Sequence, residues 1–151
     1  MKQSHTRVRW LIGVVVLLAP LSMPALSAAG VKNFIAVLNG AQEIPPNPSA
    51  ATGLAHLSFD TATNNLCYEI THTVAGEILA HIHGPDLPPG NGGVGAGIII
   101  PLPVGPSKTG CVLAPPPPFV KGDLFKGLYY INVHSGGFPA GEIRGQILRT
   151  K

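Results

Sequence analysis

From residue 31 onward, short segments rich in β-branched and aromatic residues are separated by proline and glycine about every ten residues. Segments of this length and composition, bounded by such residues, are typical of β-strands. The pattern predicts seven strands, at residues 31–38, 53–59, 66–72, 77–83, 95–100, 125–134 and 142–148. Nothing after the first 28 residues reads as a helix. We therefore expect an all-β fold, an antiparallel Greek-key-like sandwich or barrel of seven to eight short strands.

The first 28 residues have a different pattern, which predicts a secretory signal peptide. A basic start is followed by the apolar run 10–18 and by the small residues Ala25 and Ser27, which fit a cleavage site. The alternative is an uncleaved membrane anchor, but Pro20 ends the apolar run well short of the roughly 20 residues that a spanning helix needs. We expect one domain over residues 30–150, exported to the periplasm or outside the cell and not bound to a membrane after cleavage.

Removing this segment changes the charge of the protein. The whole chain has a formal net charge of +3, but Lys2, Arg7 and Arg9 leave with the signal peptide. The remaining basic and acidic residues balance, so the expected mature domain is close to neutral. Without a basic surface we expect no nucleic-acid partner.

The chain contains two cysteines, Cys67 and Cys111. In an exported protein such a pair most simply forms a disulfide, which contributes about 3–4 kcal/mol in the chain-entropy model. The alternative is a metal site that uses both thiolates, and the missing C-x-x-C spacing speaks against it.

Histidine is the residue type that points most directly to chemistry. His81 and His83 form H-I-H in a predicted strand, so both imidazoles face the same side, about 6–7 Å apart along the strand. His72 and His134 each end a predicted strand. Neutral imidazoles without a thiolate suit copper first and zinc second. We therefore expect a metal site at His81, His83 and His134 that His72 completes, with structural histidines bonded to loop carbonyls as the alternative.

The remaining polar residues point to no catalytic machinery. The chain has no G-x-S-x-G motif and no recognisable carboxylate pair, and the glycine-rich run 90–97 lacks the G-K-[ST] ending of a phosphate-binding loop. Glu142 and Arg144 share one face of the last predicted strand. We expect them to form ion pairs there; the alternative is that they support the histidine site and that Arg144 guides a small anion to it. His56 is expected to be an ordinary surface residue.

Four motifs in order carry a resemblance to a known family. They are L-N-G-A-Q-E-I-P-P-N at residues 38–47, A-T-G-L-A at 51–55, A-H-I-H-G-P at 80–85 and Y-Y-I-N-V-H-S-G-G-F-P-A-G-E-I-R-G-Q at 129–146. Together they resemble the CHRD domain, named from chordin and widespread in bacteria as a stand-alone secreted domain. The resemblance spans residues 31–148 and implies a β-sandwich or barrel in an extracellular setting.

Three functions are compatible with these features. The first is an exported metal-binding protein, with copper favoured. The second, which the relation to chordin implies, is a non-catalytic module that binds an extracellular protein partner. The third is a small redox enzyme, since H-I-H is locally similar to the H-x-H strand of copper/zinc superoxide dismutases. Five of the six histidines lie in the expected mature domain, which is too few for the ligand set of six histidines and an aspartate that those enzymes use, so we favour a function that is not enzymatic.

Overall fold

The computed structural model describes residues 30–87 and 96–151. The expected signal peptide, residues 1–28, lies outside the described residues, as does most of the glycine-rich run 90–97. Within the described part the chain forms nine strands, one short α-helix and one 3-10 turn. The strands are β1 (Val31–Asn39), β2 (Thr52–Asp60), β3 (Asn65–His72), β4 (Glu77–Gly84), β5 (Gly97–Leu102), β6 (Ser107–Val112), β7 (Tyr130–Ser135), β8 (Ile143–Gln146) and β9 (Leu148–Arg149). The helices are η1 (Gly40–Gln42) and α1 (Lys121–Phe125).

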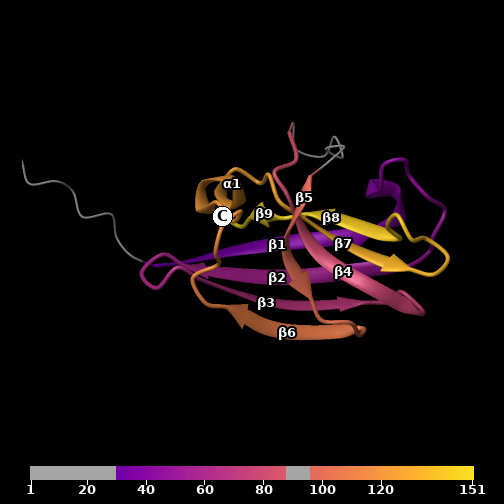
Figure 1. Cartoon of the computed structure of the whole chain (residues 1–151), viewed down its shortest axis with the longest axis horizontal. Coiled ribbons are helices and arrows are strands. Elements are labelled where there is room, and N and C mark those ends of the chain that lie inside the picture. The colour runs from indigo at the N-terminus through magenta and orange to yellow at the C-terminus, as the bar shows by residue number, and fades with distance from the viewer. Residues whose placement is uncertain (1–29, 88–95) are drawn as a thin grey trace, which may run out of the picture.

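All strand pairs are antiparallel, and eight strands follow one another in the order β5-β4-β7-β8-β1-β2-β3-β6, with β9 pairing with β1. The sheet bends round so that β4 and β5 cross the layer formed by β1, β2, β3 and β6 (Figure 1). The edge strands β5 and β6 are joined by a short turn, so the sheet is a nearly closed barrel. The predicted all-β antiparallel fold is confirmed.

Alternation along the strands builds the core. Phe34, Ala36 and Leu38 of β1 face inward and are essentially fully buried. The same alternation buries Ala55, Leu57 and Phe59 of β2 and Ala80 and Ile82 of β4. Leu124 of α1 is also buried, and its neighbour Phe125 stacks on Phe34 with ring centroids 5.8 Å apart. The short helix therefore closes one end of the barrel with apolar side chains.

Three elements differ from the sequence prediction. Strand β6 was not predicted, because Lys108 occupies an inward position of that strand and hides the apolar alternation. Phe125 belongs to α1 and not to a strand, and β7 begins only at Tyr130. The last predicted strand is divided into β8 and β9, which pair with different stretches of β1.

The predicted disulfide is present between Cys67 and Cys111. The two cysteines are directly opposite each other in the ladder between β3 and β6, and the disulfide therefore fastens an edge strand to the sheet. Among residues 30–87 and 96–151, no helix is long and apolar enough to span a membrane.

Candidate metal site

Two imidazoles project from the outer face of β4. Ala80 and Ile82 are buried in the core, so His81 and His83, which alternate with them, lie on the opposite face of the strand. The ladder to β5 changes register between Ile82 and His83, and such an irregularity re-aims the side chains next to it. The rings of the two histidines meet edge to face, with centroids 5.3 Å apart.

Strand β7 adds the third imidazole. His81 is opposite Asn132 in the ladder, and His134 is two residues further along β7 on the same face, which makes it a diagonal neighbour of His81. The ring centroids of His81 and His134 are 5.3 Å apart, and those of His83 and His134 are 6.4 Å apart. Two adjacent strands therefore bring the three histidines into one group on the outer face of the barrel.

The three rings present nitrogen atoms to one another. One nitrogen from each of His81, His83 and His134 lies within 4.8 Å of the other two. Ligand nitrogens about 2.0–2.1 Å from a common ion are at most about 4 Å apart, so binding requires the rings to close by less than about 1 Å. Nδ1 of His81 and Nε2 of His134 are buried and have no hydrogen-bond partner among the described residues. Buried nitrogens without a partner are costly, and a bound metal ion would satisfy them.

Backbone carbonyls fix the outward nitrogens of two rings. Nδ1 of His83 lies 3.2 Å from the carbonyl oxygen of Ala96, and Nδ1 of His134 lies 3.1 Å from that of Pro139. A carbonyl oxygen only accepts, so each Nδ1 carries the proton and donates it. Both Nε2 atoms then keep a free lone pair. This is the arrangement by which proteins orient histidine ligands of metals.

Burial favours the neutral form of His81 and His83. It lowers the pKa of His81 below its ordinary value of 6.5, and the neighbouring His134 lowers it further. Burial also lowers the pKa of His83, and the hydrogen bond to Ala96 opposes this effect only in part. Neutral imidazole is the form that binds a metal ion.

A stack of side chains supports His83 from the neighbouring strands. Its ring lies almost parallel to that of Tyr130, with centroids 5.2 Å apart, and Cζ of Arg144 lies 3.4 Å from the centroid of the same tyrosine. The guanidinium of Arg144 donates to Oδ2 of Asp86 at 2.5 Å in a buried ion pair. Arg144 therefore sits beside the histidine group, with its guanidinium in an ion pair with Asp86.

The other residues expected at the site lie elsewhere. His72, expected as a fourth ligand, is outside the group: its Nε2 lies 3.1 Å from Oε2 of Glu77 and 3.0 Å from Nζ of Lys108. The reason is that β3, which ends at His72, pairs with β2 and β6 and not with β4 or β7. Glu142 accepts a hydrogen bond from Oγ of Ser49 at 2.7 Å and does not contact the histidines through any described bond.

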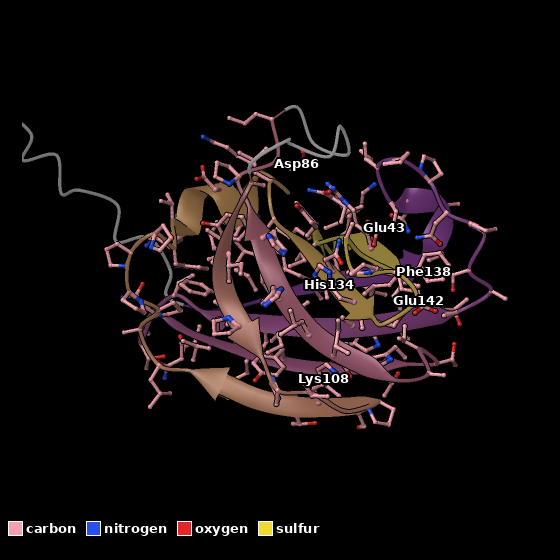
Figure 2. All side chains as sticks on the ribbon, turned by 45° about the vertical axis from the view of Figure 1, so that its right-hand side comes forward. Glu43, Asp86, Lys108, His134, Phe138 and Glu142 are labelled. Atoms are coloured by element: carbon pink, nitrogen blue, oxygen red, sulfur yellow. A yellow bond between two sulfur atoms is a disulfide. The ribbon has the colours of Figure 1, made fainter. Side chains whose placement is uncertain are left out.

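Sequence reasoning missed several residues around the site. Among them are Glu43, Asp86, Tyr130 and Asn132, all buried although two of them lie in loops and two on the outer face of β7. Figure 2 shows Glu43 and Glu142 beside His134, and Lys108 below it near the strand β6. The only signal in the sequence was position: Tyr130 and Asn132 share the face of His134 by alternation along one strand.

Comparison with known proteins identifies one family. A model of a protein family, the CHRD domain, matches residues 34–147. The match includes all three histidines of the site and every strand from β1 to β8 at least in part. No curated protein and no solved structure matches the chain.

Proposed function

This chain belongs to the CHRD domain family, and we propose that it is an exported protein that binds one transition-metal ion, copper in preference to zinc. The ligands are His81, His83 and His134. We assign the protein no catalytic role.

The observation that carries the proposal is the hydrogen bonding of the ring nitrogens: some donate to carbonyl groups, and others have no partner. Carbonyl groups hold the protons of His83 and His134 on the far side of each ring, and buried nitrogens of His81 and His134 are left without partners where the three rings meet. Structural histidines would use both ring nitrogens in hydrogen bonds. Here one nitrogen of each of the three rings lies within 4.8 Å of the other two.

The donor set favours copper. Imidazole nitrogen suits copper and zinc, and copper(II) binds a given nitrogen site more tightly than zinc does. Thiolates, which favour copper(I) and zinc, are absent from the site because Cys67 and Cys111 form the disulfide. Three protein ligands leave coordination positions for water or another donor.

We propose that this metal site functions after export from the cytoplasm. The sequence of residues 1–28 supports a cleaved signal peptide, and the disulfide is compatible with an oxidising compartment. We propose that the mature domain works in the periplasm or outside the cell.

The test is elemental analysis of protein expressed with its signal peptide and purified without chelators. We expect about one copper per chain in the wild type and a loss of most of it in His83→Ala. His56→Ala is the matched control, because His56 is exposed on β2 and is not part of the group. Near-zero metal in the wild type, both as purified and after incubation with copper(II), refutes the proposal.

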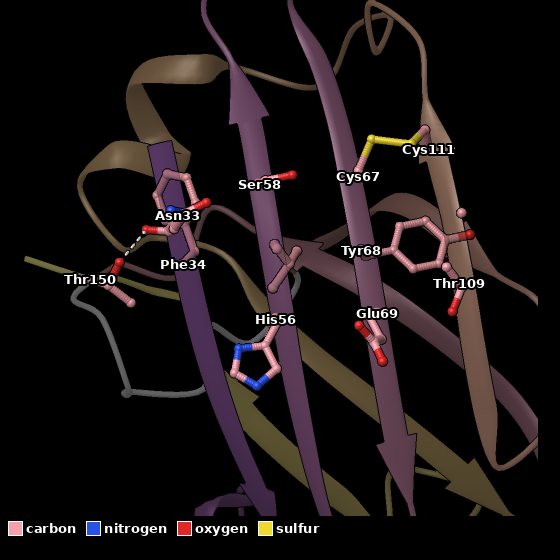
Figure 3. A pocket seen from close by; sticks show the side chains of 12 residues that line it. Asn33, Phe34, His56, Ser58, Cys67, Tyr68, Glu69, Thr109, Cys111 and Thr150 are labelled. Carbon is pink, nitrogen blue, oxygen red and sulfur yellow. Dashed lines mark hydrogen bonds between the residues drawn. A yellow bond between two sulfur atoms is a disulfide. The ribbon is translucent and has the colours of Figure 1, made fainter. Parts of the chain in front are cut away.

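A second function is favoured by a hollow on a different part of the surface. A groove of about 530 Å³ runs over β1, β2, β3 and β6, with His56, Tyr68 and Glu69 among its lining residues. Figure 3 shows the Cys67–Cys111 disulfide at one end of it. This surface supports the alternative of a non-catalytic module that binds an extracellular protein. Binding of a secreted partner that is lost in Glu69→Lys but kept in His83→Ala, in a protein without metal, would favour this alternative.

A further inference from the structure

Two buried polar side chains meet next to the histidine group. Glu43 follows η1, and Asn132 is on the outer face of β7; they are 6% and 5% exposed. Nδ2 of Asn132 donates a hydrogen bond to Oε2 of Glu43 at 3.2 Å. The pair therefore attaches the segment after β1 to the face of the sheet that carries the histidines.

The other oxygen of each group has no partner. Oε1 of Glu43 and Oδ1 of Asn132 are both buried and without a hydrogen bond among the described residues. Both border the same small space, because a Cβ added to Gly141 would lie 2.7 Å from each of them. An ionised carboxylate oxygen and an amide oxygen only accept, so this arrangement leaves two acceptors beside one space with no donor for either among the described residues. Turning the amide of Asn132 over does not help, since it only moves the oxygen opposite Oε2.

One proton resolves the conflict. A proton on Oε1 makes that oxygen a donor to Oδ1, and the second hydrogen bond closes a ring with the first. We propose that Glu43 is a protonated carboxylic acid in the folded protein and that it forms a cyclic acid–amide pair with Asn132. The pair is a proton-binding site, separate from the histidines.

Burial favours a proton on Glu43 although Arg144 opposes it, and the same guanidinium disfavours a metal ion at this place. Arg144 of β8 faces Glu43 across a shared cavity, and a cation held next to this guanidinium would be repelled. Burial raises the pKa of Glu43 from 4.5 to about 7, while the hydrogen bond from Asn132 and the charge of Arg144 lower it. The other titratable groups around the pair are Asp86, Tyr130 and, opposite Asn132 in the ladder, His81. Glu142 follows Gly141, which borders both side chains, and its carbonyl oxygen accepts a hydrogen bond from Asn47.

The pair gives the segment from Gly40 to Asn47 a pH-dependent attachment. Two other bonds hold this segment to the same region, from Nδ2 of Asn47 to the carbonyl oxygens of Gly141 and Glu142 at 3.1 and 3.0 Å. When Glu43 ionises, the acid–amide ring loses one hydrogen bond and a negative charge is left buried. The segment is therefore held more firmly below neutral pH than above it. This inference does not depend on metal binding.

The direct test is a titration of the metal-free protein labelled with ¹³C at the glutamate side-chain carboxyl. We expect one carboxyl resonance to titrate with a midpoint of about 7 and to be missing in Glu43→Gln. Glu69→Gln is the control for assignment, since Glu69 is exposed on β3. If every glutamate resonance of the folded wild type titrates between about 4 and 5, the ordinary range for this side chain, the proposal is wrong.

Denaturation gives a second measurement. A carboxyl whose pKa is raised on folding stabilises the folded state at low pH, and this contribution is lost as the pH rises through the folded pKa. Glutamine reproduces both hydrogen bonds of the ring without titrating. We therefore expect the unfolding midpoint of the wild type to fall relative to that of Glu43→Gln between pH 5 and pH 8. A constant difference between the two proteins over that range overturns the proposal.

Discussion

Nδ1 of His134 donates to the carbonyl oxygen of Pro139 at 3.1 Å, and this bond decides which nitrogen of the ring faces His81 and His83. The turn that follows β7 thus sets the tautomer of a residue on β7 itself. The second nitrogen of a histidine fixed in this way can only accept, and no donor among the described residues reaches Nε2 of His134. The geometry of the turn and the chemistry of the site are linked through this one contact.

The first prediction concerns this residue. We expect His134→Ala to weaken copper(II) binding by at least about 100-fold, because losing a ligand costs more than the 10–100-fold that losing outer support of a ligand typically costs. The measurement is a competition titration against a chelator of known affinity. His72→Ala serves as a matched control, since His72 is a buried histidine outside the group. Equal affinities in the two variants would exclude His134 as a ligand.

The second prediction concerns pH. The pKa values of His81 and His83 are lowered in the folded protein, mainly by burial, so the neutral rings needed for metal binding persist below the usual histidine range. Metal is then retained at neutral pH and released only as the pH falls below 6.5, the ordinary histidine value, when protons compete for the rings. Metal content after dialysis at steps from pH 8 to pH 4 checks this. Release already between pH 8 and pH 7 would contradict it.

The third prediction concerns the disulfide. Replacing Cys67 and Cys111 by serine should lower the free energy of unfolding by about 3–4 kcal/mol, because the unfolded chain loses a long closed loop. The bond joins β3 to β6, whereas the histidines are on β4 and β7, so copper binding by the folded double variant should be unchanged. Urea unfolding and a copper titration measure the two effects. A loss of copper binding at full folding would show that the disulfide belongs to the site.

The fourth prediction concerns a buried charge cluster. Nζ of Lys108 donates to Oε2 of Glu77 at 2.8 Å and also contacts His72 and the carbonyl oxygen of Gly105. Lys108→Met leaves the buried carboxylate of Glu77 without its partner and should lower the free energy of unfolding by about 3–5 kcal/mol.

The control for this cluster is the double variant Lys108→Met, Glu77→Gln, which removes both charges. We expect it to be more stable than Lys108→Met alone, as measured by urea unfolding. If the double variant is equally destabilised, the cost comes from packing and not from an unpaired charge.

Much of the fold could be predicted because most strands obey one rule. Turn residues separate short segments whose inward positions are apolar, and this was enough for β1 to β4 and for the all-β class. The rule fails at β6, where Lys108 is buried because Glu77, far away in sequence, neutralises it. It also fails at α1, whose five residues are too few to show a helical period.

Part of the site could also be predicted, because alternation along a strand places some of its residues on one face. H-I-H places two rings on one face by local geometry alone, and His134 is close to them because β7 pairs with β4. His72 has the same sequence signature as His134, a histidine at the end of a strand. The two histidines differ only in whether their strand lies next to β4, and this strand order cannot be read from a single sequence. Glu43 and Asp86 lie in loops next to the site, and loops have no hydrophobic periodicity from which their burial could be predicted.

The measurement that tests the central claim most directly is anomalous X-ray diffraction at the copper absorption edge, from crystals of the protein loaded with copper(II). We predict a single peak about 2.0–2.1 Å from Nδ1 of His81, Nε2 of His83 and Nε2 of His134. Anomalous density at any other position, or none next to these three nitrogens at full copper loading, would contradict the assignment of this group as the metal site.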